Sequence, residues 1–230
     1  MIDWHSHILP AMDDGSKDPD ESIAMLDALA AQGVDTVIAT PHFYANDESV
    51  DEFLSRREAS YALLEAKKTR QDIRVICGAE VRYYSGISRM EDLPKLAVGN
   101  SKLLLLEMPF AKWSEHTVKE LIELANTRGL RIIMAHIERY PALQDAKLLE
   151  TLVSNGIQMQ VHASFFDQFG TRGKAMKLLA SGCIHFIGTD CHNMTTRAPM
   201  IGDAYDFIQK KMSDDFIMQM NEYGNRALGH

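Results

Sequence analysis

Histidine and acidic residues recur at the downstream ends of apolar segments in this chain. In the first of these segments, His5 and His7 are two positions apart. Side chains two apart on a strand point to the same face, so these two imidazoles can bind one cation together. Later apolar segments are followed by His42, Glu80, Glu107, His136, Asp190 and His192. This recurrence predicts a metal centre, because imidazole and carboxylate groups together are typical ligands of divalent transition metals.

The bulk composition is that of a globular protein. A chain of 230 residues that is 46% hydrophobic can bury the core of one large domain, so we expect residues 1–230 to form a single domain. A basic amino-terminal region and an apolar segment of about 18 residues are both lacking, so we expect neither secretion nor membrane insertion. The three cysteines, Cys77, Cys183 and Cys191, have no paired spacing. Free thiols are typical of a reducing compartment, and we expect a cytoplasmic protein.

The charge balance bears on the partners. A formal net charge of -8 argues against a nucleic-acid partner, because phosphate backbones are bound by basic surfaces. Three bound divalent ions would nevertheless outweigh the carboxylates around them and make the site itself positive. An acidic chain with such a centre can therefore still attract a phosphate group. Oligomeric state has no signature in the sequence.

Apolar segments of strand length alternate with amphipathic segments of helix length along the chain. Strands are predicted near residues 1–6, 35–40, 73–79, 102–107, 130–136, 157–162 and 184–189, and helices over 19–32, 47–70, 114–128 and 203–228, the last as one or two helices. Pro19 and Ser114 suit helix starts, and Gly33 and Gly129 suit helix ends. Seven strands alternating with helices predict a parallel barrel, in which functional residues gather at the carboxyl ends of the strands.

The segments that carry these residues resemble the PHP family, named for polymerase and histidinol phosphatase. In family order they are MIDWHSHILPAMDDG at 1–15, ATPHF at 39–43, GAEVRY at 78–83, LLLEMP at 104–109, MAHIERY at 134–140 and GTDCHN at 188–193. More narrowly, the chain is similar to the bacterial manganese-dependent protein-tyrosine phosphatases of this family, which belong to capsule and exopolysaccharide operons. The resemblance implies a distorted (β/α)7 barrel of the TIM type.

The resemblance also implies three divalent ions. The first would be held by His5, His7, Glu80 and Asp190, the second by Glu80, Glu107 and His136 with Glu80 bridging, and the third by Asp14, His42 and His192. The family implies Mn²⁺, and imidazole with carboxylate also suits Fe or Zn. The lack of cysteine at the matched positions argues against a structural zinc site. Asp13 stands beside Asp14 before Gly15, so one of the two could instead shape a turn.

Arg139 and Arg197 resemble the substrate arginines of the family. A guanidinium group matches phosphate as a bidentate fork and stabilises charge on a transferring phosphoryl group. Two ions roughly 3.5–4 Å apart can lower the pKa of a shared water, so a metal-activated hydroxide would replace a protein nucleophile. The resemblance therefore implies a phosphomonoesterase acting on protein phosphotyrosine. Its implied partner is the tyrosine-rich tail of an exopolysaccharide-regulating tyrosine autokinase, and the general acid stays unassigned.

Several alternatives remain open at this stage. The ligands do not encode substrate shape, so a small-molecule phosphatase of the histidinol-phosphate type is the nearest one. A non-catalytic metal-binding regulator is another. A third is a thiolate mechanism, because Cys191 and Arg197 have the Cys-x5-Arg spacing of cysteine-dependent phosphatases. The intervening loop, however, lacks the glycines that let backbone amides surround a phosphate.

Other residues near the strand ends are candidates for the pocket. His162 ends the sixth strand, where family members usually carry a small polar residue, and we interpret it as a pocket residue and not as a ligand. Tyr83, Tyr84 and Phe110 follow ligand-bearing strands and are candidates to stack on a phenol ring. Trp4 is expected in the core.

Overall fold

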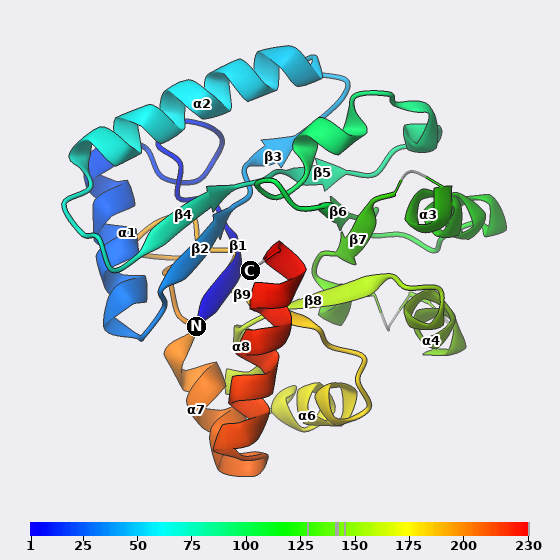
Figure 1. Cartoon of the computed structure of the whole chain (residues 1–230). Helices are drawn as coiled ribbons and strands as arrows, with labels where there is room; N and C mark the ends of the chain where they lie inside the picture. Colours follow the sequence, from blue (N-terminus) through cyan, green and yellow to red (C-terminus); the bar gives the residue numbers. More distant parts are fainter. Residues whose placement is uncertain (128, 141–142, 145, 230) are drawn as a thin grey trace.

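Parallel strands form a curled sheet at the centre of the molecule, with helices around it (Figure 1). The structure is a computed structural model that describes residues 1–127, 129–140, 143–144 and 146–229. The strands are β1 (Ile2–Ser6), β2 (Thr36–Ala39), β3 (His42–Phe43), β4 (Arg74–Cys77), β5 (Glu80–Arg82), β6 (Leu103–Glu107), β7 (Arg131–Met134), β8 (Gln158–His162) and β9 (Phe186–Gly188). Their order is β1-β2-β4 in one sheet and β3-β5-β6-β7-β8-β9 in the other.

The two sheets form one continuous arrangement of parallel strands. It is interrupted at neighbouring positions, between β2 and β3 and between β4 and β5. Ala39 pairs with Cys77, and His42 pairs with Glu80, which preserves the same offset across the gap. Pro41 lies in this gap and has no backbone N–H to donate, which explains the break. The ladder continues through its carbonyl, which accepts from Glu80 N at 3.0 Å. β2 with β3, and β4 with β5, therefore each occupy one strand position.

The last strand returns to the first. Asp190 N donates to His5 O at 2.7 Å, and His7 N donates to Cys191 O at 2.9 Å. Gly188 is required here, because a Cβ at this position would lie 2.5 Å from His5 Cβ. The predicted distorted (β/α)7 barrel is confirmed, with seven strand positions and its distortion where β2 and β4 are interrupted.

The helices follow the strands in sequence. They are α1 (Pro19–Ala31), α2 (Val50–Lys67), α3 (Glu115–Thr127), α4 (Ala146–Ser154), α5 (Ser164–Asp167), α6 (Arg172–Ala180), α7 (Gly202–Lys211) and α8 (Asp214–Leu228), with short 3-10 helices η1 (Ile87–Arg89), η2 (Leu93–Leu96) and η3 (Ile137–Arg139). The predicted closing segment is two helices, because Ser213 caps a new helix by accepting from Phe216 N at 3.1 Å.

The helix α8 covers the amino-terminal end of the barrel. In Figure 1 it runs across the front of the sheet. Its carbonyl at Ala227 accepts from Arg131, the first residue of β7. Gly224 of the same helix lies against Ile2 and Trp4 of β1, so Trp4 is in the core as expected. With this end covered, the carboxyl ends of the strands are the ones left to form a site.

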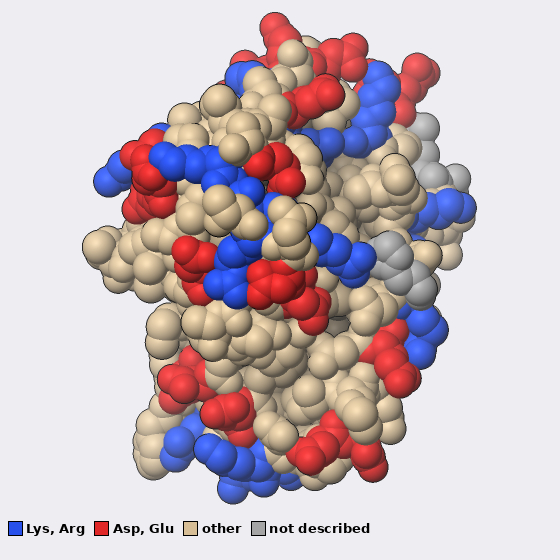
Figure 2. All heavy atoms as spheres, turned by 60° about the vertical axis from the view of Figure 1, so that its left-hand side comes forward, with Lys and Arg blue, Asp and Glu red and all other residues tan. Residues whose placement is uncertain are grey.

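The surface over α1 and α2 carries charges of both signs. Figure 2 shows acidic and basic side chains interspersed on this face, without a large area of one sign. Ion pairs such as Lys67 with Asp20 and Arg70 with Asp27 link neighbouring segments here. Among the helices that the structure describes, none combines the length and the apolar character needed to cross a bilayer.

Candidate metal centre and active site

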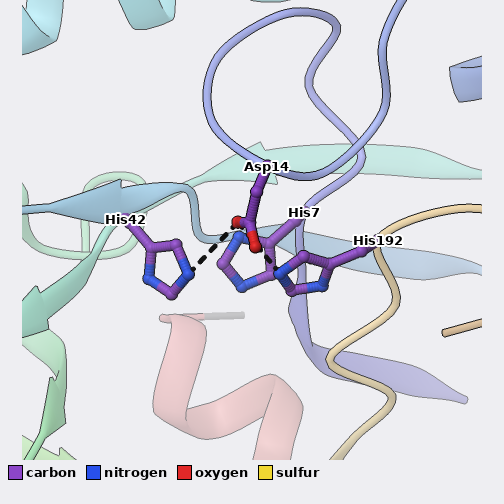
Figure 3. A group of neighbouring side chains, drawn as sticks. All are labelled: His7, Asp14, His42 and His192. Carbon is purple, nitrogen blue, oxygen red and sulfur yellow. Dashed lines mark ion pairs between the residues drawn. The ribbon is translucent and has the colours of Figure 1, made fainter.

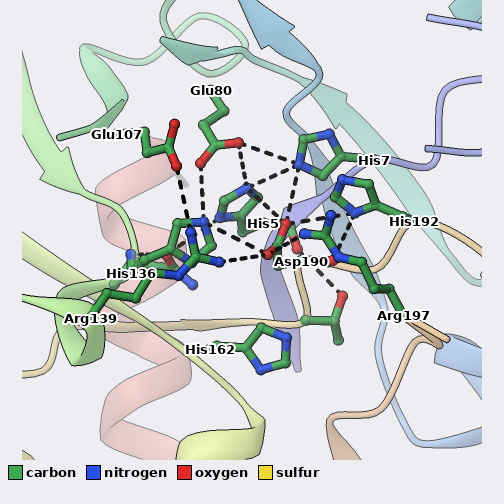
Figure 4. A network of polar contacts seen from close by, with 12 residues as sticks. His5, His7, Glu80, Glu107, His136, Arg139, His162, Asp190, His192 and Arg197 are labelled. Atoms are coloured by element: carbon green, nitrogen blue, oxygen red, sulfur yellow. Dashed lines mark hydrogen bonds and ion pairs between the residues drawn. The ribbon is translucent and has the colours of Figure 1, made fainter. Parts of the chain in front are cut away.

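The nine metal-ligand candidates from the sequence lie together on the carboxyl-terminal side of the strands (Figures 3 and 4). Each strand position except that of β8 contributes at least one of them, within or directly after the strand. Asp14 comes from the loop between β1 and α1, which folds back over the strand end. Gly15 allows this close approach, because a Cβ there would lie 2.2 Å from His7 O.

The centre of the cluster joins β1, β5 and the segment after β9. The Nε2 atoms of His5 and His7 are 3.2 Å apart. Glu80 Oε2 lies 3.3 Å from His5 Nε2, and Asp190 Oδ1 lies 3.3 Å from His7 Nε2. All four side chains are buried. Of these residues, His5, His7 and Glu80 lie close enough to hold a cation together, and Asp190 joins His5 and His136 in a neighbouring group.

A second group shares Glu80 with the first. Glu80 Oε1 lies 3.1 Å from His136 Nε2, and Glu107 completes this group from the end of β6. The two oxygens of Glu80 thus face different imidazoles. This is the arrangement that a carboxylate bridging two ions requires.

A third group consists of His7, Asp14, His42 and His192 (Figure 3). Asp14 Oδ1 lies 3.5 Å from His42 Nε2 and 3.3 Å from His192 Nε2. The Asp14 side chain is 66% exposed, so this group lies at the outer edge of the cluster. His42 Nδ1 lies 2.9 Å from Glu80 Oε2, which connects the outer group to the centre.

Hydrogen bonds from outside the cluster orient its imidazoles. Asp13 Oδ2 lies 2.7 Å from His7 Nδ1 and also accepts from His42 N at 2.9 Å. Gln160 Oε1 lies 3.4 Å from His5 Nδ1 and accepts from His136 N at 3.1 Å. Such contacts leave the Nε2 lone pairs of His5 and His7 directed into the cluster. Asp13 and Asp14 therefore occupy different places, with Asp13 behind His7 and Asp14 among the ligand candidates.

Buried opposite charges shift the acidities of these groups. Burial lowers the pKa of His136, but the carboxylates of Glu138, Glu80 and Asp190 outweigh it and raise the pKa to about 9. Burial alone would raise the pKa of Asp190, yet the imidazoles around it hold its pKa below the usual range. The carboxylates thus favour the charged form of His136, and the imidazoles favour the charged form of Asp190. Cations would compete with these protons for the same nitrogens.

Two of the cluster residues have unusual backbone conformations. His136 and Asp190 have φ of 54° and 51°, in the left-handed region that residues other than glycine rarely adopt. Both follow the last residues of their strands, β7 and β9. Such a conformation turns the chain sharply and is held only where surrounding contacts support it, often at functional sites.

Three arginines surround the same cluster. Arg197 Nη2 lies 2.5 Å from Asp190 Oδ2, and Arg139 Nη2 lies 3.5 Å from the same oxygen. Arg82, which the sequence analysis did not single out, pairs with Glu107 at 2.7 Å. These guanidinium groups are about 40% exposed, with values of 40%, 42% and 43% for Arg197, Arg139 and Arg82. They are therefore accessible to a ligand, although Asp190 is buried and Glu107 is only 13% exposed.

Two adjoining cavities open above the cluster. The polar one, of about 380 Å³, is lined by His42, Tyr44, Glu80, Arg82, Glu107, His136, Arg139, His162, Asp190 and Arg197. The other, of about 350 Å³, is lined by Met108, Phe110 and Tyr140 together with Arg82, Glu107 and Arg139, which both cavities share. A ligand whose anionic group binds in the polar cavity can therefore place an attached apolar group in the second cavity.

The aromatic residues considered in the sequence analysis have different positions. Phe110 lines the second cavity and is 68% exposed. Tyr83 is buried and donates its hydroxyl to Glu120 at 2.7 Å, and neither Tyr83 nor Tyr84 lines the two cavities in the described part of the chain. Tyr44, which the sequence analysis missed, stacks on His42 with ring centres 5.4 Å apart.

The Cys-x5-Arg segment lacks the geometry for thiolate catalysis. Cys191 is fully buried, and burial raises the pKa of its thiol well above the usual value. In the loop that follows, the amides of Thr195, Thr196 and Arg197 donate to Asn193 Oδ1 at 2.9, 2.8 and 3.2 Å. These amides are therefore turned toward a side chain and not toward a phosphate.

Comparison with known proteins gives consistent matches along nearly the whole chain. The model of the family described as capsular polysaccharide synthesis, CpsB/CapC, matches residues 1–227. Tyrosine-protein phosphatase YwqE of Bacillus subtilis (strain 168) is 33% identical over 231 residues, covering 96% of this chain and 89% of the relative. Tyrosine-protein phosphatase CpsB of Streptococcus pneumoniae is 34% identical over 231 residues, covering 92% and 90%.

A solved structure also matches the chain closely. It belongs to the crystal structures of YwqE from Bacillus subtilis and CpsB from Streptococcus pneumoniae, described as unique metal-dependent tyrosine phosphatases. The superposition has a TM-score of 0.79 at 28% identity and covers 96% of this chain and 92% of that one. The curled parallel sheet is thus shared with these phosphatases.

Proposed function

Since the chain belongs to the CpsB/CapC family of capsular polysaccharide synthesis, we propose that it is a metal-dependent phosphatase that hydrolyses phosphotyrosine on proteins. One observation carries this proposal. A polar cavity with ligand-type side chains and arginines adjoins an apolar cavity lined by Phe110, Met108 and Tyr140. A phosphoryl group fits the first by charge, and the aryl ring that bears it fits the second by hydrophobic contact.

The chemistry of the donor set fits divalent metal ions. Glu80 Oε2 and His192 Nε2 are buried and, in the described part of the structure, contact other cluster residues as ion pairs without forming a hydrogen bond. A buried polar atom without a hydrogen bond is unfavourable, and a cation would remove that cost. We propose three ions, held by His5, His7, Glu80 and Asp190, by Glu80, Glu107 and His136, and by Asp14, His42 and His192. Imidazole with carboxylate suits manganese, which we propose as the metal.

The chemistry that such ions supply is Lewis-acid polarisation of the phosphoryl oxygens and hydroxide at neutral pH. Around them, Arg139 and Arg197 would bind the phosphoryl group and stabilise the negative charge that develops on it. Their planar forks can each contact two oxygens. Phe110 and Met108 would hold the ring of the tyrosine, which fixes the direction in which the phenolate leaves. A phenol has a pKa of about 10 and needs less help from a general acid than an alkyl alcohol does.

We further propose where and on what the protein acts. The family description points to capsular polysaccharide synthesis, and the named relatives are tyrosine phosphatases. The proposed substrate is the phosphorylated, tyrosine-rich tail of a tyrosine autokinase in that system. The proposed location is the cytoplasm, and residues 1–230 are proposed to form one phosphatase domain.

Paired substrates test the proposal. Removal of metal by a chelator should abolish hydrolysis of a phosphotyrosine peptide, and Mn²⁺ should restore it. The peptide should be preferred over histidinol phosphate. Glu80→Gln should lose bound metal and nearly all turnover, because Glu80 faces two of the proposed ions. Preference for histidinol phosphate would refute the substrate, whereas turnover unaffected by chelation would refute the metal dependence.

A further inference from the structure

His162 lies in the polar cavity but stands apart from the groups that could hold an ion. It is the last residue of β8, and Figure 4 shows its ring apart from the ligand candidates, without a dashed line to any of them. It lines the same cavity as Arg139 and Arg197. In the described part of the chain, none of the groups able to hold a cation includes it. The roles proposed so far leave this imidazole unused.

The backbone around His162 determines which ring nitrogen carries the proton. Ser164 N donates to His162 Nδ1 at 3.0 Å. A ring nitrogen that accepts a hydrogen bond has no proton of its own, so the neutral ring carries its proton on Nε2. Burial lowers the pKa of His162 and favours this neutral form. A protonated Nε2 has no lone pair to offer, so in this form it cannot bind a metal.

The Nε2–H group is therefore free to donate to a ligand in the cavity. Over the ranges that the structure describes, Nε2 has no hydrogen-bond partner, while Nδ1 and the backbone N–H of His162 are both engaged. The arginines in the cavity attract an anion, and phosphoryl oxygens are strong acceptors. We propose that His162 Nε2–H donates a hydrogen bond to the phosphoryl group of the substrate, an inference that rests on the proposed phosphatase function.

A neutral donor has a distinct use beside the arginines. Arg139 and Arg197 provide charge, but each is about 40% exposed on a long flexible side chain, with values of 42% and 40%. The His162 ring is held by the Ser164 amide on its opposite edge, so its donor is already oriented before the substrate arrives. Such preorganisation restricts the phosphoryl group to one orientation at little entropic cost.

Three substitutions separate this role from a structural one. His162→Gln places an amide nitrogen the same number of bonds from Cβ as Nε2, so it keeps the donor. His162→Asn has an oxygen that can accept from Ser164 N, but its amide is one bond too short to replace Nε2. His162→Leu removes both functions. All three proteins should keep the metal content of the wild type, because His162 lies outside the proposed ligand groups. His162→Asn should also keep its melting temperature, whereas His162→Leu should melt lower because Ser164 N loses its acceptor.

Two measurements on these proteins decide the matter: kcat/KM for a phosphotyrosine peptide, and the affinity for inorganic phosphate measured by calorimetry. His162→Leu and His162→Asn should lower kcat/KM by about 10- to 100-fold and weaken phosphate binding, as expected for a lost hydrogen bond to a charged group. His162→Gln should stay within about fivefold of the wild type.

Three results would overturn the inference. Wild-type phosphate affinity in His162→Leu would show that Nε2 makes no such bond. Recovery in His162→Asn without recovery in His162→Gln would show that the contact with Ser164 is what matters. Loss of metal together with activity would make His162 a ligand. Failure of the proposed function would look different, because the wild-type protein would then bind phosphate without hydrolysing the peptide.

Discussion

Substitution of Asp13 by asparagine should damage the metal centre although Asp13 is not among the proposed ligands. The Asp13 carboxylate receives three hydrogen bonds, from His7 Nδ1 at 2.7 Å and His42 N at 2.9 Å to Oδ2, and from Gly15 N at 2.9 Å to Oδ1. All three partners are donors. An amide has only one accepting oxygen, so in either orientation its NH2 group faces at least one donor.

The size of the effect follows from these contacts. A buried donor left without an acceptor costs about 1–3 kcal/mol, so the metal-free variant should be less stable by about that amount. Loss of the carboxylate also leaves the His7 ring less firmly oriented. Removal of a hydrogen-bond partner behind a ligand typically weakens metal binding roughly 10- to 100-fold. At about 1.4 kcal/mol for each factor of ten, this loss is about as large as the loss of stability.

Asp14→Asn is the matched control. Its side chain is 66% exposed, and within the described residues its contacts are ion pairs with His42, His192 and Arg197. The metal-free control should therefore change stability by no more than about 0.5 kcal/mol. Both variants should be compared by thermal unfolding after chelation and by calorimetric titration with Mn²⁺. If metal-free Asp13→Asn were as stable as the wild type and bound Mn²⁺ as tightly, the orienting role of Asp13 would be wrong.

Three further outcomes are expected. Cys191→Ser should stay active, because the buried Cys191 thiol does not reach the cavity, and inactivity with full metal content would restore the thiolate mechanism. Arg139→Ala and Arg197→Ala should keep their metal but lower kcat/KM by on the order of 100-fold or more; unchanged rates would leave these arginines as ion pairs only. Burial alone would raise the pKa of Glu120, but hydrogen bonds from Tyr83, Gly86 and Ser88 outweigh it and lower the pKa. The carboxylate therefore stabilises the fold at pH values above its unfolded pKa of about 4.3. This stabilisation is lost as the pH falls through the lower pKa of the folded state. Glu120→Gln should thus be less stable than the wild type at pH 7, and its free energy of unfolding, measured by urea titration, should fall less between pH 7 and pH 3. A pH dependence equal to that of the wild type would contradict this role of Glu120.

The sequence predicted the site best where the position of a residue in its strand or helix determines where that residue lies in the fold. Parallel strands bring their carboxyl ends to one edge, so residues such as His5, Glu107 and His136 could be expected to meet before any contact was known. The predicted helix ends at Gly33 and Gly129 follow equally local rules, since these glycines adopt φ of 86° and 64°. The break in β2 and β4 was not foreseen, because strand pairing across a proline depends on the neighbouring strand.

The residues that orient the ligand candidates are harder to read from sequence, and the reason is physical. Gln160 lies inside β8, where its alternation with Gln158 and His162 marks a polar inward face, but its contact with His5 depends on how β8 and β1 are placed across the barrel. Asp13 has the appearance of a turn residue, and it does accept from Gly15 N as turn aspartates do. Its second oxygen reaches His7 only because the loop folds back over β1. Asp13 therefore makes both a turn contact with Gly15 and a long-range contact with His7. Only the turn contact can be predicted from the order of amino acids.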